Sequence, residues 1–355
     1  MRDERRGSAI FPPRGGLLAI ALVLGAGLAF MSLGIWGLTR GPEGGGAEVG
    51  IWSLSHGPEG GDISALAINP RSPMTLYAGT VEGHVFKTTD GGRSWAAASA
   101  GLATEYVGAL AVDPQRPSTV YAAGDGIFKA TDGGRTWRAV TAGQGNFHYS
   151  SVESLTIDPK TPATMYAVVR NVVKSTDGAR SWQAASAGLP ETPLFALAID
   201  PETPTTLYAG TYYAGVFRTT DGGGSWRAVN VGLSDTTVLA LAIDPQRPAT
   251  VYAGTSSFGV FKSTDGGGRW RALNLNPGMS EPSVGTLALD PSRPATVYAG
   301  TDDGVYRSTD GGASWDTFNQ GLTSPFVRDL AIAPDGKVLY AGTAGGRVFD
   351  HRFPG

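Results

Sequence analysis

The sequence contains no cysteine and has little net charge, and both features narrow what the protein can be. Without cysteine there is no disulfide framework, no cysteine metal site, no thiol nucleophile and no lipidated N-terminal cysteine. A formal net charge of −3 at pH 7 gives no global basic field of the kind that nucleic-acid binding needs. The four histidines, His56, His84, His148 and His351, have no metal-ligand spacing. We therefore predict no cofactor, no metal and no nucleic-acid partner.

The chain is instead rich in glycine, with 52 residues, and in proline, with 23, which suits many short strands and tight turns. One eight-residue pattern recurs along it, with aspartate third and tryptophan last. The copies are TTDGGRSW from Thr88, ATDGGRTW from Ala130, STDGARSW from Ser175, TTDGGGSW from Thr219, STDGGGRW from Ser263 and STDGGASW from Ser308. Successive aspartates lie 42 to 45 residues apart. A period of this size indicates a repeat architecture.

Each copy is typical of a β-hairpin turn followed by an anchoring tryptophan. The carboxylate can accept backbone NH groups of its own turn, the glycines supply positive φ, and the indole packs on a neighbouring sheet. We interpret the repeated residues as structural: Asp90, Trp95, Asp132, Trp137, Asp177, Trp182, Asp221, Trp226, Asp265, Trp270, Asp310 and Trp315. The alternative is a cation held by these carboxylates, but each copy offers only one, and calcium takes six or more oxygens.

The pattern S/T-x-D-x-G-x-S/T-W resembles the Asp-box of the BNR repeat family, and the resemblance covers nearly everything from about Gly50 to Phe353. It is similar to repeats of sialidases, sortilin-type receptor domains, xyloglucanase-type glycosidases and photosystem II assembly factors. The departures are Ala130 for the first hydroxyl residue, Ala179 for the glycine and Arg269 for the second hydroxyl residue. Because these relatives have unrelated activities, the resemblance implies a fold and leaves the function open.

A second pattern upstream of each Asp-box completes the repeat. In ALAIDPQRPATVYAGT, from Ala240, two apolar strands flank a polar turn. We name the four strands of a unit a (ALAI), b (VYAGT), c (before the box) and d (from the tryptophan). Four short strands per period predict a propeller blade, so we expect an all-β β-propeller. Strand a recurs at Leu66, Leu110, Leu155, Leu197, Leu241, Leu287 and Leu330, which predicts seven blades.

The last blade lacks a strand d, because the chain ends soon after Arg347–Phe349. At the other end, Ile51–Ser55 resembles an isolated strand d. We expect this N-terminal strand to complete blade seven and close the ring, which removes exposed sheet edges. The alternative is a six-bladed ring with loose ends.

The N-terminal region contains 22 uncharged residues, Leu17–Leu38, long enough to cross a bilayer as a helix. Arg2, Arg5, Arg6 and Arg14 precede it, which places residues 1–16 in the cytoplasm and the propeller on the periplasmic, extracellular or lumenal side. We predict a transmembrane signal anchor at 17–38, a flexible linker at 39–49 and the propeller at 50–355. A cleaved signal peptide is the alternative.

The a–b turns and Asp-box turns share one face of a propeller, and the b–c loops and the connections between blades share the other, variable face. Variation on a uniform scaffold is where binding specificity usually lies. The candidate binding residues there are Glu82, Tyr106, Phe147, His148, Tyr149, Arg170, Tyr212, Tyr213, Phe258, Asp302, Asp303, Phe326 and Arg328, beside His84 and Asp125. The cations before each box, such as Lys87, are interpreted as a solvated position copied with the repeat.

No catalytic constellation stands out, so we name no catalytic residue. A glycosidase needs two carboxylates placed across a bond, and nothing in the sequence pairs Asp125 with Asp302 or Asp303. We expect a non-catalytic, membrane-anchored propeller that binds a protein partner, as an assembly or stability factor or accessory subunit of a membrane complex. The alternative is a glycan-binding or glycoside hydrolase propeller of the sialidase or xyloglucanase type.

The apolar run predicts that the full-length protein stays in the membrane fraction after carbonate washing. The apolar side chains of residues 17–38 would hold the protein in the bilayer without ionic contacts. Immunoblotting of washed membranes measures this. A soluble mature protein whose first residue lies near Phe30 would contradict the prediction and show a cleaved signal.

Overall fold

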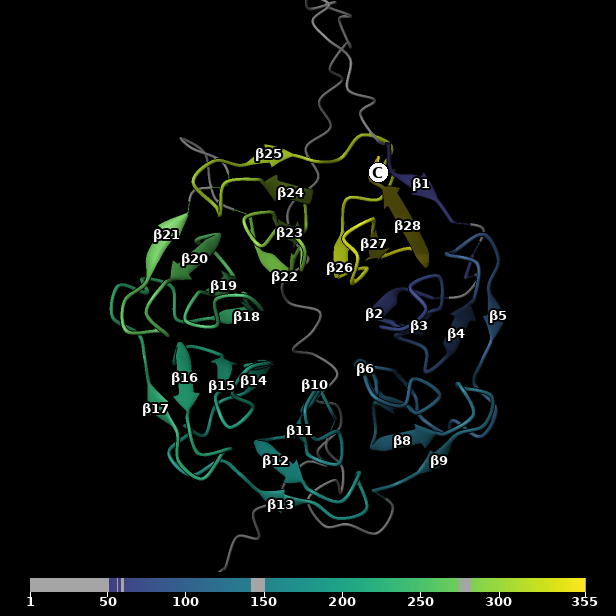
Figure 1. The fold of residues 1–355 in the computed structure, drawn as a ribbon, viewed down its shortest axis with the longest axis horizontal. Coiled ribbons are helices and arrows are strands. Elements are labelled where there is room, and N and C mark those ends of the chain that lie inside the picture. Colours follow the sequence, from purple (N-terminus) through teal and green to yellow (C-terminus); the bar gives the residue numbers. More distant parts are fainter. Residues whose placement is uncertain are drawn as a thin grey trace, which may run out of the picture. The chain divides into compact units, whose positions relative to one another are not determined.

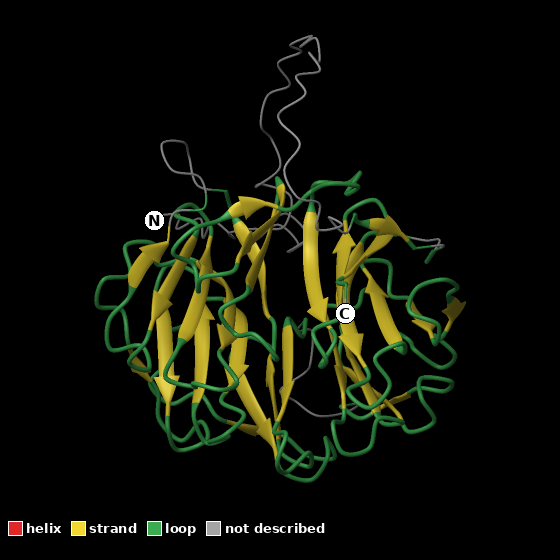
Figure 2. Ribbon diagram, turned by 45° about the horizontal axis from the view of Figure 1, so that its top comes forward, coloured by secondary structure: helices red, strands yellow, loops and turns green. Residues whose placement is uncertain are grey.

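The computed structural model describes residues 51–55, 57–58, 61–141, 151–273, 275 and 282–354. They belong to a compact unit that runs from Glu48 to Gly355. The described residues contain strands and loops, and Figure 2 shows the strands standing side by side around a centre. No helix among them is long and apolar enough to cross a membrane. The predicted anchor at 17–38 and the linker at 39–49 lie outside the described residues.

The described strands form seven four-stranded antiparallel sheets, which confirms the seven-bladed propeller. Strand a is the innermost (Figure 1): β2 (Ile63–Ile68), β6 (Ala109–Val112), β10 (Ser154–Ile157), β14 (Leu194–Ile199), β18 (Val238–Ile243), β22 (Val284–Leu289) and β26 (Val327–Ile332). Strand b is β3 (Leu76–Thr80), β7 (Val120–Ala123), β11 (Met165–Val168), β15 (Leu207–Thr211), β19 (Val251–Thr255), β23 (Val297–Thr301) and β27 (Val338–Thr343).

The outer half of each blade follows the same order. Strand c is β4 (Val85–Thr88), β8 (Ile127–Ala130), β12 (Val172–Ser175), β16 (Val216–Thr219), β20 (Val260–Ser263), β24 (Gly304–Ser308) and β28 (Arg347–Arg352). Strand d is β5 (Ala96–Ala97), β9 (Arg138–Ala139), β13 (Gln183–Ala184), β17 (Arg227–Ala228), β21 (Arg271–Leu273), β25 (Asp316–Thr317) and β1 (Ser53–Leu54).

The ring closes through the N-terminal strand, as the sequence predicts. β1 pairs antiparallel with β28, with Ser53 opposite Asp350 and Leu54 opposite Phe349. The indole of Trp52 donates a hydrogen bond of 2.6 Å to the carbonyl oxygen of Phe318 in blade six. Other boxes repeat this contact, since the Trp226 indole donates to the Ala185 carbonyl oxygen at 2.7 Å. Trp52 therefore takes the place of an Asp-box tryptophan for the blade that has no box.

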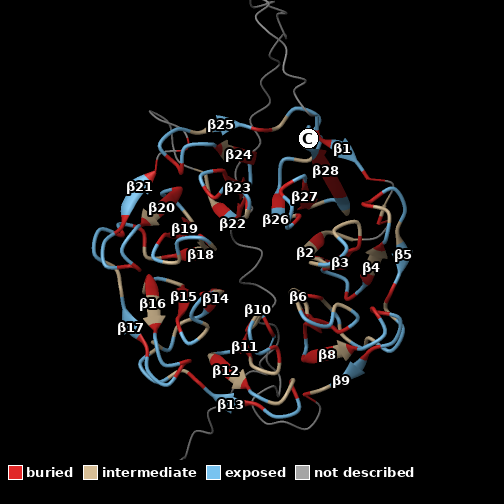
Figure 3. Cartoon of the chain, in the orientation of Figure 1, coloured by how far each residue is buried: buried red, intermediate tan, exposed pale blue. Residues whose placement is uncertain are grey.

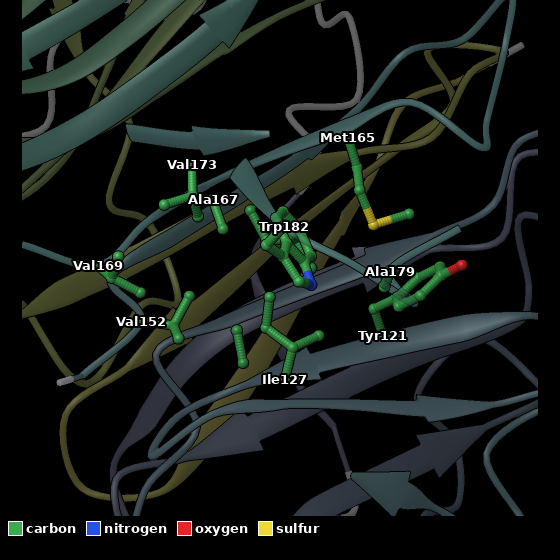
Figure 4. Packing of buried hydrophobic residues seen from close by; sticks show 11 residues of the cluster. Tyr121, Ile127, Val152, Met165, Ala167, Val169, Val173, Ala179 and Trp182 are labelled. Atoms are coloured by element: carbon green, nitrogen blue, oxygen red, sulfur yellow. The ribbon is translucent and has the colours of Figure 1, made fainter. Parts of the chain in front are cut away.

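The hydrophobic core lies mainly between neighbouring blades. Strand b is buried along its whole length, as in β3 and β15, whereas the d strands at the outside are largely exposed (Figure 3). Figure 4 shows one seam, where Tyr121 and Ile127 of blade two pack with Met165 and Trp182 of blade three. Alternation of apolar and polar residues is typical of strands with one buried face. It does not predict these strands, which are buried on both faces.

Four of the six cations that precede a box bind the next blade and are not merely solvated, which corrects our interpretation of these four. Lys87 Nζ donates to the carbonyl oxygen of Gly133, in the following Asp-box, at 2.8 Å, and lies 5.3 Å from the Tyr77 ring centroid. The Tyr77 hydroxyl donates to the same oxygen at 3.1 Å. Lys129, Lys174 and Lys262 repeat the contact, and Arg352 donates to Gly91 across the closure. Sequence alone could not show that these cations reach a neighbouring blade.

Replacing Trp52 with alanine should destabilise the closed ring by about 3–5 kcal/mol, the usual cost of removing a buried large side chain. Trp52 is 3% exposed, and its loss leaves the Phe318 carbonyl without its indole donor. Urea unfolding measures the change. The matched control is Ile51→Ala, at a neighbouring residue that is 52% exposed and should cost little. Equal stability of the two variants would contradict closure through Trp52.

Candidate functional site

The Asp-box face is built from self-contained turns. The Asp90 carboxylate accepts the Thr88 hydroxyl at 2.7 Å, the Ser94 backbone NH at 2.9 Å and the Ser94 hydroxyl at 2.6 Å. The Thr88 hydroxyl oxygen in turn accepts the Gly92 NH at 3.0 Å. The Asp90 carboxylate thus forms these hydrogen bonds within its own turn. Among the residues that the structure describes, no group of three or more histidines and acids could hold a metal ion.

The departures from the motif keep this turn. Asp132 lacks the first hydroxyl donor, because Ala130 stands there, but it still accepts the Thr136 NH and hydroxyl. Asp265 still accepts the Ser263 hydroxyl at 2.7 Å and the Arg269 backbone NH at 2.9 Å, and lacks only the second hydroxyl donor. Ala179 adopts φ 72° where the other boxes have glycine, and its NH donates to the Ser175 hydroxyl oxygen. Hydrogen bonds to the Asp177 carboxylate, of which the one from the Ser181 hydroxyl contributes most, lower the pKa of Asp177 to about 2.

The tryptophans of the boxes fit the structural interpretation. Trp137, Trp182, Trp226 and Trp270 are buried, and Trp95 and Trp315 are half-buried. The indole of Trp270 donates to the Val229 carbonyl oxygen at 2.6 Å, so it too reaches the preceding blade. These residues hold neighbouring blades together.

The opposite face presents the b–c turns and the connections between blades. Of the predicted binding residues, Glu82, Arg170, Tyr213, Phe258, Asp302, Asp303, Phe326 and Arg328 are exposed there. Phe258 and Phe326 are 53% and 57% exposed. Phe147, His148 and Tyr149 lie outside the described residues. Tyr106 is half-buried and donates its hydroxyl to the Gly124 carbonyl oxygen at 3.1 Å, so this residue has a structural role.

Three aromatic side chains of blade four lie together on this face. The Tyr212 and Tyr213 rings are 3.7 Å apart between centroids, and their hydroxyl groups are hydrogen-bonded at 2.6 Å. Phe195 packs edge-on against Tyr212 at 5.9 Å. Tyr213 is 68% exposed and has φ 66°, which β-carbon sterics disfavour outside glycine. The Tyr212–Tyr213 turn therefore holds an apolar surface in water at a conformational cost.

A cavity of about 250 Å³ opens beside Phe195, where the starts of the inner strands converge; we call this place the channel mouth. Its lining comes from the starts of the inner strands and includes Glu153, Phe195, Thr286, Arg328 and Asp329. Arg328 forms an ion pair of 3.0 Å with Asp62, which also accepts the Gly345 NH. Of the predicted binding residues, only Arg328 lines this cavity among those that the structure describes.

Asp329 joins three blades in this cavity. Its carboxylate accepts the Leu66 NH of blade one at 2.7 Å, the Leu330 NH at 2.9 Å and the Thr286 hydroxyl of blade six at 3.2 Å. Burial, partly offset by these hydrogen bonds, raises the pKa of Asp329 to about 6. Because structural donors surround it, this carboxylate is poorly placed to act on a substrate.

Sequence reasoning missed Asp62, Glu153, Phe195 and Asp329. The sequence did contain a signal for these residues. Ala65, Ala196 and Ala240 occupy the position that Asp329 has in blade seven, and the residue before this position differs from blade to blade. Comparing the starts of the seven a strands would have found the residues that meet at the channel.

Comparisons with known proteins support the fold. The family model described as sortilin, neurotensin receptor 3, matches residues 214–341. A search of curated protein sequences gives no significant match. Solved structures match more of the chain. The GH74 xyloglucanase from Xanthomonas campestris aligns with a TM-score of 0.68 and 20% identity over 85% of this chain and 54% of that one.

Two structures of YCF48 align over nearly their whole length. YCF48 bound to D1 peptide has a TM-score of 0.68 and 13% identity, covering 87% of this chain and 97% of that one. YCF48 from Cyanidioschyzon merolae has a TM-score of 0.67 and 13% identity, covering 85% and 98%. This chain spans 54% and 46% of the first two GH74 structures. At these identities the likeness shows the fold.

Fold and repeats together define the class of the protein, a single-ring, seven-bladed β-propeller. Its six Asp-box turns make it an Asp-box, or BNR-type, repeat propeller, as the motif resemblance implies.

The raised pKa of Asp329 predicts a pH-dependent stability. The folded pKa of about 6 lies above the roughly 3.9 of an unfolded aspartate, so the folded state holds the extra proton between these values. The free energy of unfolding should therefore fall as pH rises from about 4 to 6, by on the order of 2–3 kcal/mol.

Urea unfolding across this range, compared between wild type and Asp329→Ala, measures the contribution. Alanine is compatible with the site, because Ala65, Ala196 and Ala240 stand at the equivalent positions. The variant should lose this part of the pH dependence, while Asp302→Ala controls for removal of an exposed carboxylate. A variant that keeps the full wild-type slope would show that Asp329 does not cause it.

Proposed function

We propose that the protein is a non-catalytic propeller that binds a protein partner through its variable face. The observation that carries this is the exposed aromatic group of Phe195, Tyr212 and Tyr213 beside the channel cavity. Aromatic side chains are enriched in the centres of protein interfaces, where they provide large contact area at little entropic cost. The conformational cost of the Tyr212–Tyr213 turn has no evident role in the ring itself.

The likeness to YCF48 supports a protein ligand. One of those structures is described as bound to D1 peptide, and the chain aligns with nearly all of it. The apolar run Leu17–Leu38 further supports a membrane anchor, with the propeller held close to the membrane surface. A partner in a membrane complex, to which the protein contributes as an assembly or stability factor, would fit this position.

A glycoside hydrolase is the second candidate, favoured by the likeness to the GH74 xyloglucanase. A hydrolase needs an acid and a second carboxylate on opposite sides of the scissile bond. Asp329 in the cavity is occupied by three donors, and Asp62 outside its lining is paired with Arg328, which leaves Glu153 without a second carboxylate for such a reaction. The cavity therefore favours binding over hydrolysis.

The double variant Tyr212→Ala/Tyr213→Ala should weaken binding of the native partner at least about tenfold, since interface energy concentrates in a few aromatic anchors. Pull-down of the full-length tagged protein from detergent-solubilised native membranes, followed by titration of the recovered partner, measures this. Thermal melting should show that both proteins fold.

The matched control is Val231→Ala, at a residue that is 60% exposed and whose carbonyl oxygen accepts the Trp270 backbone NH. It should leave the partner bound. Retention of the partner by the tyrosine variant would contradict this docking face. Release of sugar from a polysaccharide by the purified protein, abolished by Glu153→Gln, would favour the hydrolase instead.

A further inference from the structure

The channel mouth is formed by one repeated position, two residues before the central leucine of each a strand. Its occupants are Ser64, Gly108, Glu153, Phe195, Leu239, Gly285 and Arg328. All of these except Leu239 line the cavity of about 250 Å³. Glu153 and Phe195 come from adjacent blades, at β10 and β14, so a carboxylate and an aromatic ring border the same space. Ser64, Gly108 and Gly285 are small and leave that space open.

The charges of this cavity are unbalanced. Arg328 is already neutralised by Asp62 at 3.0 Å. Glu153 accepts a hydrogen bond from the neutral Ser151 hydroxyl, and no basic group of the described residues forms an ion pair with it. Asp329 adds a second carboxylate, held only by neutral donors. The cavity thus has an excess of negative charge beside an aromatic surface.

The surrounding face has the same sign of charge. Among its described residues, the acids are Asp62, Glu82, Glu105, Asp125, Glu153, Glu191, Asp235, Asp302 and Asp303. The basic residues there are Arg170, Arg328 and Arg347. Acidic side chains therefore clearly outnumber basic ones around the channel mouth. All lysines of the described residues lie outside this face. The resulting negative electrostatic potential attracts cationic partners and repels anionic ones.

We infer that the channel mouth is a receptor for a lysine or arginine side chain, and that the partner docks through a basic segment. This inference rests on the proposed function, because the segment belongs to a protein bound at the variable face. The cation enters between the Glu153 carboxylate and the Phe195 ring. A carboxylate provides a charge-assisted hydrogen bond, and the ring face attracts a cation through its quadrupole.

The size of the cavity agrees with a single long side chain. A volume of about 250 Å³ corresponds to roughly eight waters at about 30 Å³ each, enough for one extended side chain and too little for a folded element. The Phe195–Tyr212–Tyr213 group then lies beside the entrance, where it can contact the backbone and flanking residues of the segment. An anionic segment would instead meet Glu153 and Asp329 with Arg328 already paired.

The test uses the full-length protein in detergent and three fluorescein-labelled peptides of equal length. Their glycine–serine frame is identical, and they differ only in three central residues, which are lysine, glutamine or glutamate. Fluorescence anisotropy should show saturable binding of the lysine peptide alone, weakening as salt rises because the attraction is electrostatic. Glu153→Gln and Phe195→Ala should each weaken it by about tenfold.

The matched control is Glu202→Gln, which removes an exposed carboxylate from the a–b turn of the opposite face. It should bind the lysine peptide as the wild type does. Equal binding by Glu153→Gln and the wild type, better binding of the glutamate peptide, or no saturable binding up to about 1 mM, the weak end of specific affinities, would overturn the inference.

The native partner separates this inference from the proposed function. If the partner is lost from the Tyr212→Ala/Tyr213→Ala variant but retained by Glu153→Gln, the docking face stands and the basic segment is wrong. If both variants retain it, the docking face itself is wrong. Loss from both, with Glu202→Gln unaffected, supports both proposals.

Discussion

The hydrogen bond from a lysine of one blade to a glycine carbonyl of the next Asp-box joins neighbouring blades at four places in the ring, beside the apolar core that lies between them. The bond from Lys87 to Gly133 requires the box to present that carbonyl outward, and the Asp132 carboxylate fixes the turn that does so. Each box therefore acts at a seam between two blades. This explains why the motif recurs with the period of the blade and why its carboxylates are occupied within the turn. The other face carries no copy of this repeated turn, although Tyr106 and Asp329 make structural contacts there.

The freedom of that second face is visible at the channel mouth. Four a strands have alanine at the position of Ala65. The residue before this position varies over the seven a strands, from glycine to phenylalanine and arginine. Strand b forms much of the core between blades, so the residues at the starts of most a strands can vary, whereas Asp329 binds its neighbouring blades there. Six of the seven positions then converge on one cavity, and their combination sets its charge and shape.

The fold could be predicted from the sequence because every element repeats. Six boxes, seven a strands and an unpaired Ile51–Ser55 segment leave one consistent closure, and β1 indeed pairs with β28. The candidate site was predicted less completely, because it has no repeated signature. Glu153 and Phe195 are distant in sequence from Arg328 and meet it only once the ring is closed. The role of Lys87 was missed for the same reason, since its acceptor belongs to another repeat.

The pairing of β1 with β28 also imposes an order in time. Leu54 lies opposite Phe349, so the first strand of the ring to be synthesised needs one of the last as its partner. At roughly 5–20 residues per second, the intervening chain takes some tens of seconds to emerge from the ribosome. During that interval blade one has no neighbour on one side and its apolar seam is open. The seam between blades one and seven can therefore form only after the last strand has been synthesised.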